Sequence, residues 1–213
     1  SVVILPAEGD ECERLHHMAV CRGAVPLVNA NAHMGMAHSL KLAARHAAST
    51  GADGLLIMLA DMPFVDAALM AEVVGGWVAC AQPQGAIVRP LGQAGWSKSN
   101  YAGQVGHPVL FGSEHFGALS KLSGDEGAAA FIKAFAAQGG TVTCIATQHM
   151  GAFFDIDTAD DLAQANALVS TAALHASRAG HEGFVATAGP TSLTGPTQIS
   201  GPTPISGGQH SPC

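Results

Sequence analysis

Three aspartates stand where buried strands are expected to end, and carboxylates in that place can hold a metal ion. Asp61 follows the unbroken apolar run 55–60, and Asp155 and Asp157 lie in the Phe-Phe-Asp-Ile-Asp run 153–157. Ligands of open α/β sheets bind just outside the carboxyl ends of strands, so two such ends can share one cleft. Mg2+ takes one or two carboxylates and completes its coordination with substrate phosphates. The spacing predicts such a site; the alternative, that Asp61 only caps a loop, stays open.

Three further residues are candidates for contact with a ligand. Gly35 and Ser39 flank the start of a predicted helix, 36–48, whose free backbone donors suit an anion. An ordinary capped helix explains the same pattern equally well. His107 lies at the end of a long glycine-containing excursion, where it can touch a substrate, although lone histidines are more often structural.

The elements that must position these residues alternate between strands and helices. Apolar runs predict short strands at 2–5, 25–28, 55–60, 86–90, 106–112, 141–146 and 153–158, and periodicity predicts helices at 8–18, 36–48, 67–80, 114–122, 127–137 and 159–177. The run 55–60, which Pro63 terminates, is typical of a strand buried on both faces. Asp66, Asp125 and Thr158 are the expected helix N-caps. This order predicts an α/β fold, a three-layer α/β/α domain around a mostly parallel sheet with right-handed crossovers.

The composition fits one sizeable α/β domain and argues against two kinds of partner. The 213 residues are 48% hydrophobic and 12% charged, with a net charge of -7, and nucleic acids and anionic membranes both require a basic patch. We expect neither a signal peptide nor a membrane span.

The five scattered cysteines lack zinc spacing and suit a reducing cytosol, so the predicted location is cytoplasmic. Residues 183–213, rich in Gly, Pro, Ser and Thr, predict a disordered tail.

Five segments, taken in order, resemble the motifs of the MobA-like nucleotidyltransferases, and among these most of all the molybdenum cofactor cytidylyltransferases. They are Asn29 with Gly35–Leu40, Leu59–Val65, Gly106–Phe111, Gly124–Ala128 and Asp155–Leu162. The resemblance implies a Rossmann-like sheet of the nucleotide-diphospho-sugar transferase type. The expected domain covers residues 1–178, followed by the tail of residues 183–213.

The activity that the resemblance implies is transfer of CMP from CTP to molybdopterin-bound molybdenum, with release of pyrophosphate. Mg2+ is the implied cofactor, and Asp61 is then the catalytic residue that holds it together with Asp155 and Asp157. The implied partners are the nucleotide, molybdopterin and the apoenzyme of a molybdenum hydroxylase.

The resemblance also divides the remaining candidates between two substrates. Asn29, Gly35 and Ser39 are implied to lie on the nucleotide side. His107 and the turn that contains Gly124 and Asp125 are implied to lie on the pterin side.

The sequence departs from these relatives at its start. Relatives open with a strand and a glycine-rich loop that cradles the triphosphate, whereas Val2–Leu5 matches their second strand. The sheet is therefore expected to lack its first strand, which leaves neighbouring edges unpaired or differently paired.

This departure leaves several hypotheses open. The N-terminus can be shortened, or another chain can supply the loop. The protein can instead be a non-catalytic cofactor-binding or insertion chaperone for a molybdenum hydroxylase. A MobA-like protein with another nucleotide is a further alternative. A redox role ranks last, because the chain has no Gly-x-Gly-x-x-Gly fingerprint.

Overall fold

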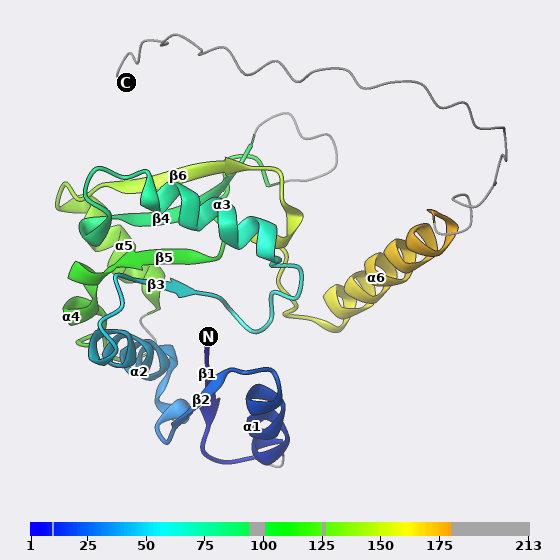
Figure 1. Cartoon of the computed structure of the whole chain (residues 1–213), viewed down its shortest axis with the longest axis horizontal. Helices are drawn as coiled ribbons and strands as arrows, with labels where there is room; N and C mark the ends of the chain where they lie inside the picture. The colour runs from blue at the N-terminus through cyan, green and yellow to red at the C-terminus, as the bar shows by residue number, and fades with distance from the viewer. Residues whose placement is uncertain (10, 94–100, 125–126, 180–213) are drawn as a thin grey trace, which may run out of the picture. The chain divides into compact units, whose positions relative to one another are not determined.

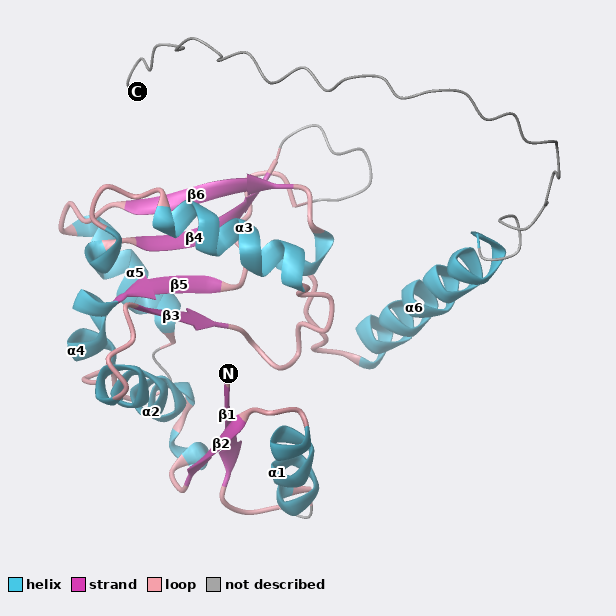
Figure 2. Cartoon of the chain, in the orientation of Figure 1, coloured by secondary structure: helices cyan, strands magenta, loops and turns pink. Residues whose placement is uncertain are grey.

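The structure is a computed structural model that describes residues 1–9, 11–93, 101–124 and 127–179. Residues 1–165 form one compact unit, and the second unit begins at Asn166. Helices and strands alternate along the chain (Figure 2). The elements are β1 (Val2–Pro6), α1 (Cys12–Cys21), β2 (Val25–Asn29), η1 (Ala32–Met34), α2 (Met36–Ser49), β3 (Gly54–Ile57), α3 (Ala67–Val78), η2 (Pro83–Gly85), β4 (Ile87–Gly92), β5 (Val109–Gly112), η3 (Ser113–His115), α4 (Phe116–Leu119), α5 (Ala128–Ala137), β6 (Val142–Thr147), η4 (Met150–Ala152) and α6 (Ala159–Ala179), where η marks a short 3-10 helix.

The strands of the described residues form two sheets. β1 and β2 pair in parallel, with Val2 opposite Val25. The other sheet has the strand order β3-β5-β4-β6, in which β4 and β6 are parallel and β5 is antiparallel to both β3 and β4. The predicted α/β class is confirmed. The four-stranded sheet is mixed, however, because β5 runs against its neighbours.

Helices cover both faces of the four-stranded sheet, as the three-layer prediction requires (Figure 1). Successive residues of a strand point to opposite faces, so each strand serves two cores. Ile87, Val109 and Phe111 pack with residues of α2, α4 and α5 on one face. Val88 and Leu110 pack with α3 on the other face.

β3 lies at the edge of its sheet, so the expectation of a central strand buried on both faces is wrong. It spans only Gly54–Ile57, and all four of its residues are half-buried. Met58, just beyond the strand, is 48% exposed. The physical reason is that β3 pairs with β5 alone within the described ranges, where its other side has no partner strand. The apolar run 55–60 does not distinguish an edge strand from a central one, because periodicity alone carries no information about pairing.

Residues 153–158 do not form the strand that their composition predicted. η4 is followed by a loop in which Phe154 makes an edge-to-face contact with Phe64, with ring centroids 5.2 Å apart. Phe153 stacks on Tyr101 instead. Both rings pack against aromatic side chains from other segments, and the backbone of residues 153–158 does not pair with a strand.

Two of the three expected N-caps are observed. The Asp66 carboxylate accepts a hydrogen bond from the Leu69 N–H at 2.8 Å. At α6 the Thr158 hydroxyl accepts from the Asp161 N–H at 3.2 Å, and the Asp161 carboxylate accepts from the Thr158 N–H at 2.8 Å, which completes a capping box. Asp125 and the tail predicted at 183–213 lie outside the described residues, and the N-cap position of α5 is Gly127.

The topology gathers three connections at one edge of the four-stranded sheet. β3, β4 and β6 point the same way, so the segments that follow β3 and β6 leave from one edge. β5 is reversed, so the loop that precedes it lies at this edge too, with Val109 opposite Ile57. Asp61, His107 and Asp155 are carried by these three connections. None of the helices in the described ranges has the length and apolar character needed to span a bilayer.

Gly112, at the end of β5, tests how tightly the sheet packs on η2. A Cβ atom at this position would overlap the carbonyl oxygens of Pro83 and Gln84, which are backbone atoms that cannot rotate away. We expect Gly112→Ala to lower the free energy of unfolding by about 2 kcal/mol or more, measured by urea titration. Gly117→Ala in α4 is the control, because a Cβ there meets nothing within 4 Å. Equal losses of stability in the two variants would contradict the packing described here.

Candidate functional site

A cavity of about 450 Å3 lies where the three connections meet. Its volume is in the range of ligand pockets, roughly 300–1,000 Å3. The segment after β3 contributes Leu59 and Met62, and the first turns of α6 contribute Asp161 and Gln164. The remaining lining residues come from the connection before β5 and from the end of η4 with the loop after it, namely Tyr101, Gln104, Val105, Gly106, His107, Ala152, Phe153, Phe154 and Asp155.

The structure brings the segments of Asp61 and Asp155 together, although β3 and β6, which precede them, are the two outer strands of the four-stranded sheet. Asp155 lines the cavity, whereas Asp61 lies beside it, between the lining residues Leu59 and Met62 in the chain. The Ile156 N–H donates to the main-chain carbonyl of Asp61 at 3.0 Å, so the two segments run side by side. Both carboxylates lie close enough to the His107 ring to raise the pKa of that histidine. Both aspartates are also exposed to solvent, which leaves their side chains accessible to a ligand.

His107 is held in place by its backbone and kept neutral by its surroundings. Its N–H donates to the Ala152 carbonyl at 2.8 Å. Burial lowers the pKa of His107 below its ordinary value, and the Arg89 guanidinium lowers it further. A hydrogen bond to the Ile57 carbonyl and the charges of the two aspartates oppose that shift without reversing it. The Nδ1 atom is buried and has no hydrogen-bond partner among the described residues.

One wall of the cavity is aromatic. The rings of Tyr101 and Phe153 are stacked, with centroids 5.3 Å apart and planes 21° from parallel. Both residues line the cavity that Asp155 and His107 also line. The site thus combines carboxylates, a neutral imidazole and a flat apolar surface, which suits a ligand with a phosphate at one end and a planar ring at the other.

The donor set fits a hard divalent cation held partly by substrate. Within the described ranges, no three His, Cys, Asp or Glu side chains converge to form a metal site. Asp61 and Asp155 supply two carboxylates, which is the number that Mg2+ commonly takes from a protein. Asp157 stands at the start of α6, where its N–H donates to the Asp161 carboxylate at 3.3 Å. A role for Asp157 in metal binding stays a prediction.

Asp161 lines the same cavity but already has hydrogen-bond donors of its own. Its carboxylate accepts from the hydroxyl of Thr158 at 2.7 Å and from the N–H of the same residue. These bonds, together with the one from the Asp157 N–H, hold the pKa of Asp161 below its ordinary value. The residue therefore contributes a fixed negative charge to the cavity wall.

A second group of predicted residues forms around the start of α2. The Asn29 amide donates to the Ser39 hydroxyl at 3.0 Å, and its carbonyl oxygen accepts from the Asn31 N–H at 3.0 Å. Asn29 is only 6% exposed, so these two bonds satisfy a buried amide. Gly35 occupies the N-cap position of α2 with φ +101°, a conformation that favours glycine.

Gly124 belongs to this second group in space. Its carbonyl accepts a hydrogen bond of 3.4 Å from the Ala37 N–H in the first turn of α2. Gly127, on the other side of the same turn, packs close to the Met36 sulfur. The resemblance had implied that this turn lies with His107, and its role on the pterin side stays a prediction.

Sequence reasoning missed the aromatic wall and the charge behind His107. Tyr101 is the only tyrosine of the chain, and that rarity was the one available signal. Phe153 was assigned to a strand, which concealed its contact with Tyr101. Arg89 lies in the middle of β4, and only the observed packing shows that its guanidinium acts on His107.

A sequence profile decides the family. The profile of the MobA-like NTP transferase domain matches residues 2–141. The chain belongs to the MobA-like NTP transferase family. The matched range includes Asp61 and His107 and ends before Asp155. Membership places the domain among the nucleotidyltransferases and confirms the resemblance that the five sequence segments indicated.

One curated protein is similar in sequence to this chain. The purine catabolism protein PucB of Bacillus subtilis (strain 168) is 31% identical over 131 residues, which are 62% of this chain and 56% of PucB. The chain therefore spans little more than half the length of that relative.

Solved structures show the fold. A homologue of Mycobacterium tuberculosis Rv0371c from Mycobacterium sp. strain JC1 has 23% identity and a TM-score of 0.55, over 80% of this chain and 75% of that one. Rv0371c from M. tuberculosis H37Rv has 23% identity and a TM-score of 0.52, over 76% and 73%. Its manganese complex also matches, with 22% identity and a TM-score of 0.49 over 76% and 75%. The first two identities are below 25%, so these two structures bear on the fold alone, and the third match carries no argument.

The lowered pKa of His107 predicts a loss of stability in mild acid. Below its usual pKa of about 6.5 a histidine takes up a proton in the unfolded chain, while folded His107 stays neutral to lower pH. The unfolded state then binds more protons, so the free energy of unfolding falls as the pH drops below that value. We expect His107→Gln to reduce this fall, measured by urea titration at pH 7.5 and 5.5 with EDTA present.

His33→Gln is the matched control, because His33 is exposed on η1. This variant should keep the pH dependence of the parent. If His107→Gln also kept it, the burial of a neutral ring at position 107 would be contradicted.

Proposed function

We propose that this protein transfers CMP from CTP to the molybdopterin form of the molybdenum cofactor and releases pyrophosphate in an Mg2+-dependent reaction. The observation that carries the proposal is that Asp61 and Asp155 both lie near His107, next to a cavity that Asp155 and His107 line and that has an aromatic wall. Membership of the MobA-like NTP transferase family supports the reaction type. The choice of CTP and molybdopterin rests on the motif resemblance described above.

In this proposal Asp61 and Asp155 hold the Mg2+ ion. When bound, the ion neutralises phosphate charge and stabilises the transition state of the transfer. The chain itself supplies few cations, with 9 Lys and Arg residues against 16 Asp and Glu residues. A triphosphate at this site therefore needs a metal ion to offset repulsion.

Binding of the two substrates is divided between the two groups of residues. Asn29 and Ser39 fix the loop before α2. The positive end of the helix dipole at the start of α2 suits an anion of the nucleotide, although the Ala37 N–H there already donates to Gly124 and the His38 N–H to Gly35. On the other side, Tyr101 and Phe153 offer a flat surface to the pterin ring. The neutral His107 ring can exchange a hydrogen bond with a heterocycle without adding charge.

The reaction is an exchange of one phosphoanhydride bond for another. An oxygen of the molybdopterin phosphate attacks the α-phosphorus of CTP and forms the new P–O–P linkage. The bond between the α-phosphorus and the bridging oxygen breaks, and pyrophosphate leaves with that electron pair. The two carboxylates orient the ion and the substrates supply both the nucleophile and the leaving group, so no protein nucleophile is required.

The product would pass to the apoenzyme of a molybdenum hydroxylase, which is the partner that we propose. A cytoplasmic location belongs to the same proposal. Its support is that the four cysteines among the described residues, Cys12, Cys21, Cys80 and Cys144, are all free thiols.

Asp61→Asn tests the proposal directly. We expect pyrophosphate release from CTP and molybdopterin in the presence of Mg2+ to fall on the order of 100-fold or more, because the variant removes a charged metal ligand. The thermal midpoint should change little, since Asp61 is exposed and its structural hydrogen bond uses the main-chain carbonyl.

Asp53→Asn is the matched control, because Asp53 is an exposed aspartate that precedes β3 as Asp61 follows it. Its activity should equal that of the parent protein. Unchanged pyrophosphate release in the Asp61 variant would refute the assignment. Binding of molybdopterin without any release in the parent protein would favour the chaperone hypothesis instead.

A further inference from the structure

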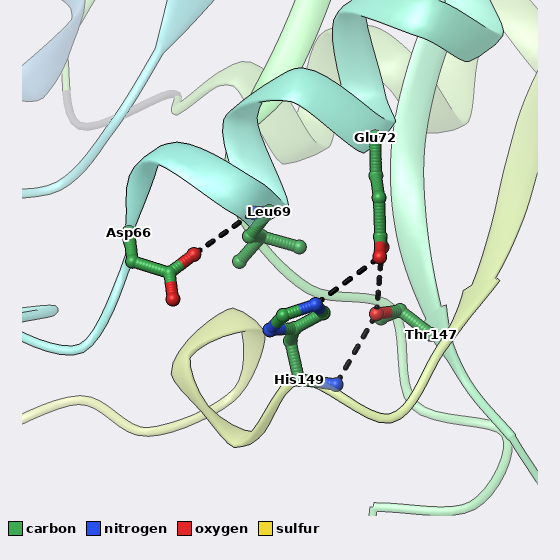
Figure 3. A network of polar contacts seen from close by, with 5 residues as sticks. All are labelled: Asp66, Leu69, Glu72, Thr147 and His149. Carbon is green, nitrogen blue, oxygen red and sulfur yellow. Dashed lines mark hydrogen bonds and ion pairs between the residues drawn. The ribbon is translucent and has the colours of Figure 1, made fainter. Parts of the chain in front are cut away.

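Glu72 ties the two carboxylate-bearing segments to one helix. Its Oε2 atom accepts from the Thr147 hydroxyl at 3.1 Å, and its Oε1 atom lies 3.1 Å from Nε2 of His149. The Thr147 hydroxyl oxygen in turn accepts from the His149 N–H at 3.2 Å. Figure 3 shows the resulting network between α3 and the segment that leaves β6.

The same helix is fixed to the segment that carries Asp61. Asp66 caps α3 through the Leu69 N–H at 2.8 Å, and Figure 3 shows this cap at the start of the helix that presents Glu72. α3 therefore contacts the segment after β3 at its first turn, and the end of β6 with the segment after it at its second turn.

The two segments also touch each other directly, between these anchor points. Ile156 donates to the Asp61 carbonyl, and the rings of Phe64 and Phe154 meet edge to face. A Cβ atom on Gly151 would overlap the Phe64 carbonyl, so the backbones are in close contact there. The two segments that carry Asp61 and Asp155 are thus joined at several points. The contacts of Glu72 with Thr147 and His149 are the last of these points and lie away from both aspartates in sequence.

Glu72 has no place in the chemistry itself. Among the described residues its carboxylate contacts Thr147 and His149 and neither Asp61 nor Asp155, and it is the only charged residue in the twelve-residue helix α3. A lone carboxylate with both oxygens engaged on one neighbouring segment is typical of a residue that fixes that segment. Thr147, which receives one of these contacts, is only 4% exposed, so a buried hydroxyl depends on it.

We infer that Glu72 is a positioning residue, which sets the placement of Asp155 relative to Asp61 and thereby the affinity of the cation site. The inference rests on the proposed function, since it requires that these two aspartates hold the ion. Residues hydrogen-bonded directly to metal ligands typically change metal affinity about 10–100-fold when they are replaced. Glu72 acts one step further away, through Thr147 and His149 and the chain that leads to Asp155, so we expect an effect at the lower end of that range.

The test measures Mn2+ binding to the full chain by electron paramagnetic resonance, because Mn2+ prefers the same oxygen ligands as Mg2+. We expect Glu72→Ala to raise the Kd for Mn2+ about tenfold or more, with circular dichroism and thermal midpoint showing a folded protein. Thr147→Val, which removes the hydroxyl at similar volume, should act in the same direction. The double variant should have a Kd for Mn2+ no higher than that of the single variant with the higher Kd, because both changes break the same contact.

The conservative variant separates positioning from charge. Glu72→Gln keeps an oxygen that accepts from Thr147 and an amide that can face His149, so Mn2+ affinity should return close to that of the parent. A residue that acted through its negative charge would not be rescued in this way. Glu11→Ala is the control for loss of a surface carboxylate, because Glu11 pairs with Arg14 at 3.0 Å on the exposed side of α1.

Two results would overturn the inference, and only the second would also overturn the metal site at Asp61. If Asp61→Asn loses Mn2+ binding while Glu72→Ala keeps parental affinity, Glu72 has no positioning role and the metal site stands. If Asp61→Asn itself keeps parental affinity, the assignment of the ion to Asp61 fails, and the role of Glu72 fails with it.

Discussion

The hydrogen bond from the Ile156 N–H to the Asp61 carbonyl joins two segments that lie about a hundred residues apart in the chain. The sheet delivers both segments to one edge because β3 and β6 point the same way, but pairing within the sheet stops short of them. The main-chain hydrogen bond joins the two segments beyond the last paired residues of the sheet. It uses the backbone of Asp61 and not its carboxylate, so the proposed ligand role and the structural role of this residue depend on different atoms.

The reversed strand β5 explains why a histidine joins this pair of aspartates. In a wholly parallel sheet, the start of a strand lies at the edge opposite the strand ends. Because β5 is antiparallel to β3, Val109 lies opposite Ile57 and the loop before it meets the carboxylates. Burial of the His107 ring, and then the nearby Arg89 guanidinium, lower the pKa of this histidine and favour its neutral form. A single change of strand direction thus places an uncharged hydrogen-bonding group next to two negative ones.

The sequence predicted most of the helices and strands and the α/β class, because these follow from local periodicity. The strand-end rule also anticipated that the segments of Asp61 and Asp155 approach each other, although Asp155 does not directly follow a strand. It did not predict that β3 lies at an edge, because an apolar run does not reveal its pairing partners. It also assigned Phe153 and Phe154 to a strand, although their contacts to Tyr101 and Phe64 are non-local. The role of Glu72 was equally out of reach, since it depends on residues 75 and 77 positions away.

Gly151 sets the spacing between the two segments through main-chain atoms alone. Its backbone lies directly against the Phe64 carbonyl, with no side chain between them. Spacing that depends on side chains varies with their rotamers, whereas spacing between main chains is limited by hard-core repulsion of atoms that do not rotate. The gap between the segments is therefore insensitive to rotamer exchange at this point. A rotamer change of Tyr101 or Phe153 would alter the aromatic surface but would not by itself change the main-chain contact between Gly151 and Phe64.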